Sequence, residues 1–293
     1  MRQASRIAAP LLAALLAASC AHAPRSATVD HAAPQAPEVD SVTVGLWHMD
    51  ETGGSRVADA GPYRLEASAG VETRTDFGRY RGARFFTRSM DSFVFVPYTP
   101  LMDPAGPFTV EAWVRPTAYG PYELTVIAGR WNQLANQQSW LLAIAGRDLR
   151  GAAAALPSPG FFDALLTGSH ALGHVLFAIQ PDQADAPRSF SSTAALELDK
   201  WTHVAASLDG DVVRIFVEGR LDAQYALHAR IRASIAPLML GNVIEPRRLT
   251  DFGGDLRVNP NGDNNPYYAY EGYLDELRIS SAARGDFPST RLR

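Results

Sequence analysis

The chain has 293 residues, of which 46% are hydrophobic and 20% are charged, so it is long enough to bury one large core or two modest ones. We expect a single domain, because all-β sandwiches of about 200 residues or more are common. The net charge of −4 leaves no basic footprint, which argues against nucleic acid as a partner.

The first 19 residues have the pattern of a signal peptide. Arg2 and Arg6 give a basic start, and the apolar run over 7–18 follows. This run is shorter than the roughly 20 apolar residues that span a bilayer. We therefore predict a signal peptide over residues 1–19 and an exported protein.

Cys20, the only cysteine of the chain, follows the sequence Leu16–Ser19 (LAAS). This arrangement resembles the lipobox of bacterial lipoproteins, although Ala17 stands where that motif prefers Leu. The resemblance implies lipidation of Cys20. The alternative is an ordinary cleavage after Ala23, which Pro24 disfavours.

Residues 20–40 are rich in Ala and Pro and show no apolar periodicity, so they cannot bury enough surface to offset their ordering entropy. We predict a tether that holds a domain clear of a lipid surface. The expected location is the outer membrane or the cell surface, with membrane contact only through the lipid. A secreted or periplasmic protein is the alternative.

From residue 41 onward, short apolar runs alternate with polar residues, which is typical of half-buried strands. We expect strands at 42–46, 82–86, 92–97, 108–116, 126–130, 139–145, 174–179, 238–242 and 270–279. Two segments, 147–173 and 245–270, lack this pattern and are predicted to be long loop insertions. A polar loop is expected after residue 179, through Thr193.

The clearest local element is a hairpin over residues 198–224. Val204, Ala206 and Leu208 alternate with smaller residues in its first arm, and a second period-two arm runs through residues 213–217. Gly210 lies between the arms, where it can adopt the positive φ of a tight turn. A second turn is expected at Glu218-Gly219-Arg220.

Four motifs carry a resemblance to a known family: Lys200–Ala205 (KWTHVA), Val213–Arg220 (VRIFVEGR), Phe108–Pro116 (FTVEAWVRP) and Tyr270–Ile279 (YEGYLDELRI). They resemble the LamG-like jelly-roll family of the concanavalin A-like lectin/glucanase superfamily, with Phe216 in place of the usual Tyr. The resemblance spans residues 42–284 with two gaps. It implies an all-β fold: a two-sheet antiparallel jelly-roll sandwich over 41–285, with a tail at 286–293.

The same superfamily includes hydrolases and lyases that act on polysaccharides, and their retaining members place two carboxylates about 5 Å apart. A strand-borne E-x-D-x-x-E run would supply such a pair, but the sequence contains none. Asp275 and Glu276 are adjacent, so a regular strand would point them to opposite faces. We predict a protein that is not an enzyme.

The resemblance implies a structural Ca²⁺ ion between the first and last strand regions, where Asp50 and Asp275 occupy the acidic positions. The alternative is that Asp50 caps a turn and Asp275 pairs with an arginine such as Arg278. The spacing of Asn and Asp in residues 259–265 (NPNGDNN) also resembles a Ca²⁺ loop, or else ordinary turn chemistry.

Two loop regions combine aromatic and amide side chains, which is the mixture that sugar sites use. We predict a ligand-binding groove formed by Trp131, Asn132, Gln133, Arg247, Asn265, Tyr267 and Tyr268. The alternative is that these residues only pack the insertions against the sandwich.

The sequence therefore predicts a non-catalytic, exported binding module that recognises a polysaccharide or glycan at the cell envelope. The first alternative is a protein-interaction or structural lipoprotein with no small ligand, whose partner is an envelope or extracellular protein. A hydrolase or lyase of the same superfamily is the third possibility.

Overall fold

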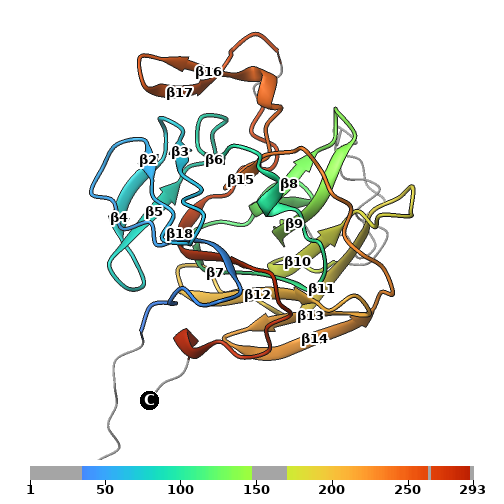
Figure 1. Cartoon of the computed structure of the whole chain (residues 1–293). Coiled ribbons are helices and arrows are strands. Elements are labelled where there is room, and N and C mark those ends of the chain that lie inside the picture. The colour runs from blue at the N-terminus through green and yellow to red at the C-terminus, as the bar shows by residue number, and fades with distance from the viewer. Residues whose placement is uncertain (1–34, 147–169, 263–264, 291–293) are drawn as a thin grey trace, which may run out of the picture.

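The computed structural model describes residues 35–146, 170–262 and 265–290. These residues form two eight-stranded antiparallel sheets that pack face to face, with a separate two-stranded hairpin at one end (Figure 1). The predicted all-β, two-sheet jelly-roll sandwich is confirmed.

The first sheet, sheet A, is built around the closing strand of the chain. Its order is β14 (Arg220–Ala226), β13 (Val212–Val217), β12 (Thr202–Leu208), β7 (Phe108–Pro116), β18 (Gly272–Ser280), β5 (Gly82–Phe86) and β4 (Arg74–Phe77). An eighth strand, β1 (Thr43–Trp47), also pairs with β18. Strand β18 thus has three partners, because β5 and β1 share one of its edges.

The second sheet, sheet B, has the order β11 (Arg188–Ala195), β10 (His174–Ile179), β9 (Gln137–Ala145), β8 (Leu124–Asn132), β15 (Leu238–Leu240), β6 (Val94–Val96), β3 (Ala67–Ala69) and β2 (Arg56–Val57). The separate hairpin consists of β16 (Leu249–Phe252) and β17 (Asp255–Val258). The described residues also form the short 3-10 helices η1 (Pro100–Met102), η3 (Pro246–Arg248) and η4 (Pro288–Thr290). Within the described ranges, no helix has the length and apolarity needed to cross a bilayer.

The predicted central hairpin is confirmed. Strands β12 and β13 pair in register from Val204 with Val217 to Leu208 with Val213. Gly210 adopts a φ of 104° in the turn, as predicted. The turn at Glu218-Gly219 has positive φ at both residues, which suits the tight connection to β14.

Three parts of the chain differ from the sequence prediction. The segment after residue 179 contains β11 and not a loop as far as Thr193; its one large apolar side chain, Phe190, gave little signal. The insertion at 245–270 contains the β16–β17 hairpin. Most of the other insertion, residues 147–169, lies outside the described residues, as do residues 1–34.

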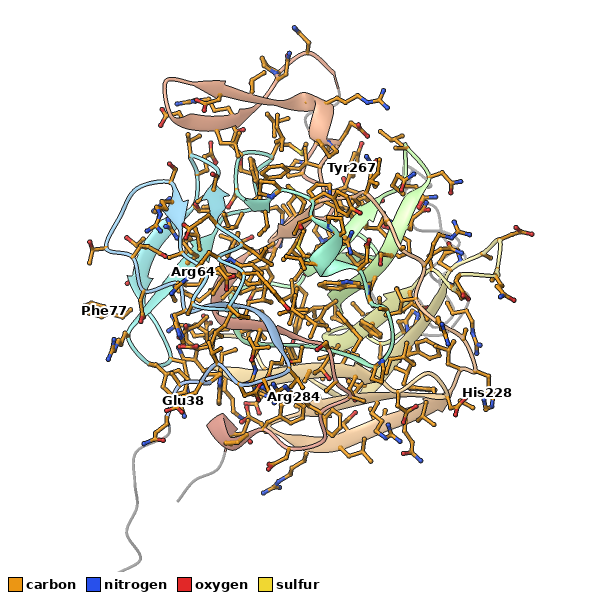
Figure 2. All side chains as sticks on the ribbon, in the orientation of Figure 1. Glu38, Arg64, Phe77, His228, Tyr267 and Arg284 are labelled. Atoms are coloured by element: carbon orange, nitrogen blue, oxygen red, sulfur yellow. The ribbon has the colours of Figure 1, made fainter. Side chains whose placement is uncertain are left out.

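One residue of the predicted tail at 286–293 packs on the domain. Phe287 is buried and packs on Phe216 and His203, on the face of sheet A that points away from sheet B. Arg284 pairs with Asp40 at 2.7 Å, so the two ends of the described chain meet on this face (Figure 2). Packing of the domain therefore continues beyond residue 285.

The main core fills the space between the sheets with aliphatic and aromatic side chains. Trp47, Phe86, Trp140 and Phe177 are fully buried there. Each buried side chain of this size contributes roughly 1.5–3 kcal/mol through the apolar surface that it removes from water. With Cys20 as the only cysteine, the fold depends on this core and not on disulfides within the chain.

Arg130 in β8 is a buried cation that joins sheet B to two loops. It donates hydrogen bonds to the carbonyls of Met102, Ser234 and Ala236 and to the carboxylate of Asp103. Burial lowers the pKa of Arg130, whereas Asp103 opposes that change. One side chain thus satisfies backbone carbonyls that would otherwise be buried without donors.

We expect Arg130→Met to destabilise the domain by about 3 kcal/mol or more, because it removes one partner of a buried ion pair and leaves several carbonyls unsatisfied. Urea unfolding followed by tryptophan fluorescence measures this change. Arg220→Met, at an exposed position of β14, is the matched control and should alter stability little. Equal stabilities of the two variants would contradict this role of Arg130.

Candidate functional site

The face of sheet B that points away from sheet A is not solvated but covered by apolar side chains. Along β9 and β10, alternate residues leave the main core: Leu141 and Leu176, for example, join a second cluster with Trp131 and Tyr268. A third cluster, which includes Ile244, lies beneath the β16–β17 hairpin. We call this surface the outer face of sheet B.

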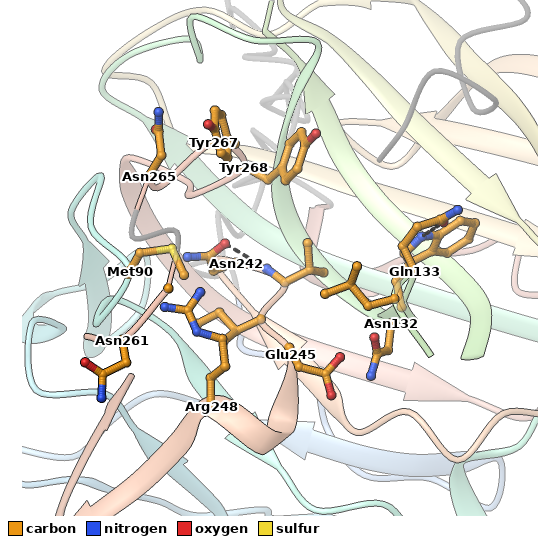
Figure 3. Close-up of a pocket in the computed structure, with 15 residues that line it drawn as sticks. Met90, Asn132, Gln133, Asn242, Glu245, Arg248, Asn261, Asn265, Tyr267 and Tyr268 are labelled. Atoms are coloured by element: carbon orange, nitrogen blue, oxygen red, sulfur yellow. Dashed lines mark hydrogen bonds between the residues drawn. The ribbon is translucent and has the colours of Figure 1, made fainter. Parts of the chain in front are cut away.

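A pocket of about 310 Å³ opens on this outer face, between the β8–β9 turn and the second insertion (Figure 3). It is lined by Met90, Trp131, Asn132, Gln133, Leu134, Asn242, Val243, Ile244, Glu245, Arg248, Asn261, Gly262, Asn265, Tyr267 and Tyr268. The pocket lies where the second and third apolar clusters meet, which explains why much of its wall is apolar.

The structure brings six of the seven predicted ligand-binding residues to this pocket: Trp131, Asn132, Gln133, Asn265, Tyr267 and Tyr268. They come from segments that are more than 120 residues apart in sequence. Trp131 and Tyr268 also belong to the second apolar cluster and Tyr267 packs against it, so packing of the insertions against the sandwich accounts for these three side chains as well.

Arg247 does not reach the pocket. Its side chain is 85% exposed and its Nε lies 3.5 Å from Glu245. The neighbouring Arg248 lines the pocket instead, and its guanidinium donates to the carbonyl of Asn259 at 3.0 Å. Both arginines belong to η3, in which successive side chains diverge by about 120°, so sequence alone does not indicate which one points inward.

Trp131 is buried, with only 3% of its surface exposed, so it is a wall of the pocket and not an open platform. Its Nε1 donates to Gln133 Oε1 at 3.2 Å, and the same oxygen accepts from Gln138 Nε2 at 3.0 Å. Tyr267 is half-buried and packs against Tyr122 and Tyr268. The aromatic surface that a ligand could contact therefore comes mainly from Tyr267.

The charges of the pocket are few. Glu245 is the one carboxylate and Arg248 the one cation among the described lining residues, whereas the amides are more numerous. Glu245 lines the pocket, and its side chain is largely buried. A pair of carboxylates suited to glycoside hydrolysis is thus not present in the described lining.

The predicted metal ligands lie in a different region, where β18 meets the loop before β5. Asp275 is fully buried; its Oδ2 accepts from the backbone N–H groups of Arg79 and Tyr80, at 2.8 and 3.3 Å. Its Oδ1 has no hydrogen-bond partner in the described structure. Burial, reinforced by the nearby Glu276 carboxylate, raises the pKa of Asp275 to about 8.

A bulge in β18 determines how these carboxylates point. Glu276 has a φ of 55°, and the register with β7 shifts between Asp275 and Arg278. As a result Asp275 and Glu276 both lie near Asp50, whose charge raises both of their pKa values. The prediction that the two carboxylates point to opposite faces was wrong, because it assumed a regular strand.

Arg278, the arginine suggested as an alternative partner for Asp275, is engaged elsewhere. Arg278 pairs with Glu111, with 2.6 Å between its NH2 and Oε1. His203 lies 2.9 Å from the other oxygen of Glu111. Glu276 in turn lies 2.6 Å from His48, and this hydrogen bond raises the pKa of His48.

The donor chemistry at Asp275 fits a hard cation such as Ca²⁺, because a desolvated carboxylate oxygen lacks a partner and Asp50 is close by. Asp50 Oδ1 accepts from the Gly82 N–H at 2.8 Å, which resembles the capping alternative. The described residues contain no group of three or more His, Cys, Asp or Glu suited to a metal. A cation held by Asp50 and Asp275 would need backbone carbonyls and water as further ligands.

The second candidate calcium loop, residues 259–265, includes Asp263, which lies outside the described residues.

We expect calcium to raise the melting temperature of the protein by several degrees, because the cation would offset the cost of the buried Asp275 carboxylate. Asp275→Asn should abolish this gain and, in the presence of a chelator at pH 8, should match or exceed the stability of the native chain. Differential scanning calorimetry with calcium and with chelator measures both effects. A calcium gain that persists in Asp275→Asn would contradict this site.

Comparison with known proteins places the fold in a family. Residues 88–286 match the family described as the Concanavalin A-like lectin/glucanases superfamily. A search of curated proteins gives no significant match.

Several solved structures share the fold at low sequence identity. The binding domain of Paraclostridial Mosquitocidal Protein 1 has a TM-score of 0.55 and 10% identity, over 83% of this chain and 49% of that one. The Botulinum Neurotoxin serotype D ligand binding domain in complex with N-acetylneuraminic acid has a TM-score of 0.53 and 12% identity, over 85% and 49%. A structure of botulinum neurotoxin type C, whose cell entry depends on interaction with two ganglioside molecules, gives 0.52 and 11%, over 83% and 49%.

This chain spans about half the length of those structures. At such identities the likeness establishes the fold alone, since the same fold serves many functions.

Proposed function

Because this chain belongs to the Concanavalin A-like lectin/glucanases superfamily, we propose that it is a non-catalytic module that binds carbohydrate. The site is the pocket on the outer face of sheet B. The observation that supports this proposal is the convergence there of Tyr267, several amide side chains and Arg248 from distant parts of the chain.

These groups suit the chemistry of a sugar. A sugar ring offers C–H groups that pack on an aromatic face and hydroxyls that pair with amides and charged groups. The volume of about 310 Å³ lies near the lower end of the range of roughly 300–1,000 Å³ for small-molecule sites. A pocket of this size suits a single sugar unit and not a long polysaccharide segment.

The compared structures are consistent with this proposal at the level of the fold. The serotype D domain was solved in complex with N-acetylneuraminic acid, and the type C toxin depends on gangliosides. N-acetylneuraminic acid is a carbohydrate, and a ganglioside is a lipid that carries carbohydrate. This support is an analogy between members of one fold and carries no residue of the site from one protein to the other.

The residues that line the pocket favour a protein that binds a carbohydrate without hydrolysing it. Glu245 would have to act without a second carboxylate, and it already lies 3.5 Å from Arg247. A hydrolase or lyase of the superfamily would need a second acidic group or another base at the reacting bond.

We further propose that the protein is exported and held at the cell envelope through lipidated Cys20 and the tether at 20–40. These residues fall mostly outside the described structure, so this part of the proposal comes from the sequence alone. The described chain starts at residue 35, and in Figure 2 the nearby Glu38 lies on the side of the domain opposite Tyr267. An anchor at the N-terminus would thus leave the pocket accessible.

One observation favours a protein partner as the second candidate function. Leu134, at the pocket, is 68% exposed, and Val243 and Met90 add further apolar surface. An apolar side chain of a partner protein could occupy such a pocket.

We expect Arg248→Gln to weaken glycan binding by about tenfold or more, because a hydrogen bond from a charged donor contributes roughly 1.5–3 kcal/mol. Arg247→Gln is the matched control, since the adjacent Arg247 points away from the pocket. A glycan array screened with the full chain identifies ligands, and titration calorimetry measures the two variants.

Equal loss of affinity in both variants would place the site elsewhere. Absence of binding to any glycan would contradict the carbohydrate proposal and favour a protein partner. Trp131→Ala is not a suitable test, because emptying a buried position of this size destabilises a domain by about 3–5 kcal/mol.

A further inference from the structure

The aliphatic part of the pocket wall restricts what can bind there. Met90, Leu134, Val243 and Ile244 contribute side chains without hydrogen-bonding groups. An unsubstituted sugar ring carries a hydroxyl on most of its carbons. Each hydroxyl pressed against this wall would lose water without gaining a partner, at a cost of roughly 1–3 kcal/mol. The group that meets this wall must therefore be apolar.

Hydrogen-bond donors lie next to the aliphatic wall, on the β8–β9 turn. Asn132 Oδ1 accepts from the Ala135 N–H at 3.2 Å, and Gln133 Oε1 accepts from two side chains. The oxygens of both amides are thus engaged within the protein. Their NH₂ groups have no partner among the described residues and remain as donors for a ligand.

An acceptor lies on another side of the same wall. The Glu245 side chain is largely buried, with 14% of its surface exposed, and it lines the pocket. Its Oε1 has only a long contact of 3.5 Å with Arg247, so the carboxylate can accept a further hydrogen bond. Val243 and Ile244 immediately precede Glu245 in the chain, so apolar surface and acceptor are close together.

An acetamido group has these three properties together: a carbonyl oxygen that accepts, an N–H that donates and a methyl group that requires apolar contact. Building on the proposed carbohydrate function, we propose that the sugar unit bound in this pocket carries an acetamido group. The amides of Asn132 and Gln133 supply donors for its carbonyl, Glu245 accepts from its N–H, and the methyl packs on the aliphatic wall.

Other substituents satisfy only part of this site. A 6-deoxy sugar or a methyl ether supplies a methyl group but no N–H for Glu245. A free amino sugar supplies N–H groups but no methyl group for Val243 and Ile244. These compounds therefore serve as the comparison ligands.

The test is titration calorimetry of the full chain with methyl glycosides in matched pairs. The pairs are N-acetylglucosamine with glucose, N-acetylgalactosamine with galactose, and N-acetylmannosamine with mannose, with glucosamine and fucose as further probes. We expect at least one acetamido sugar to bind about tenfold more tightly than its parent, glucosamine or fucose. Equal or tighter binding of a parent sugar would overturn the inference.

Two other outcomes separate this inference from the proposed function. Binding of array glycans that lack any acetamido group, with no binding of the six paired sugars, would overturn the inference and leave the carbohydrate function intact. Absence of binding to every glycan would overturn both.

A variant tests the aliphatic wall directly. Val243→Thr keeps the shape of the half-buried side chain but replaces a methyl with a hydroxyl, so it should reduce the preference for the acetamido sugar by about three- to fivefold. Val217→Thr, at a half-buried position of β13 in sheet A, is the matched control and should leave the preference unchanged. An unchanged preference in a folded Val243→Thr protein would contradict the role of this wall.

Discussion

Sheet A depends on β18, a strand that pairs with two different strands along the same edge. Strand β18 pairs through residues 272–274 with β5 and through 277–280 with β1, while β7 runs along its other edge. The two residues between these segments, Asp275 and Glu276, have no strand beside them on that edge. The bulge with Glu276 at positive φ occupies this gap, and the loop at 79–82 closes it with backbone N–H groups. The burial of the neighbouring carboxylates of Asp275 and Glu276 is therefore a consequence of the strand order.

The two outer faces of the sandwich are covered in different ways. On sheet A, Phe287 and the ion pair between Arg284 and Asp40 bring both ends of the chain onto the surface. On sheet B, the chain after β15 crosses the surface, forms the β16–β17 hairpin and returns through Tyr268. The cover of sheet B consists of two apolar clusters that do not fully join, and the pocket occupies the space between them.

The sequence predicted the sandwich because its strands alternate clearly and four of them carry family motifs. It also predicted most of the pocket, since aromatic and amide residues in two insertions are an unusual combination. It failed where local geometry departs from a regular period: the bulge at Glu276, and the 3-10 turn that directs Arg248 inward and Arg247 outward. Neither irregularity follows from side-chain types: the bulge lies where β18 changes its neighbouring strand, and the two arginines of the 3-10 turn are adjacent and chemically alike. The burial of Trp131 is a tertiary effect, because Leu141, Leu176 and Tyr268 belong to the same apolar cluster.

The chain enters the domain near Glu38 and the pocket lies beside Tyr267, at opposite ends of the molecule in Figure 2. When such a domain is attached to a surface by its N-terminus, neighbouring copies present their pockets side by side in one layer. A target with repeated units then meets several pockets at once, and the effective local concentration after the first contact greatly exceeds that in solution. Weak recognition by a single small pocket is thereby sufficient for firm adhesion, provided that the copies are dense enough. Under the proposed anchoring and carbohydrate binding, surface density would join the chemistry of the pocket in determining how tightly the protein holds its target.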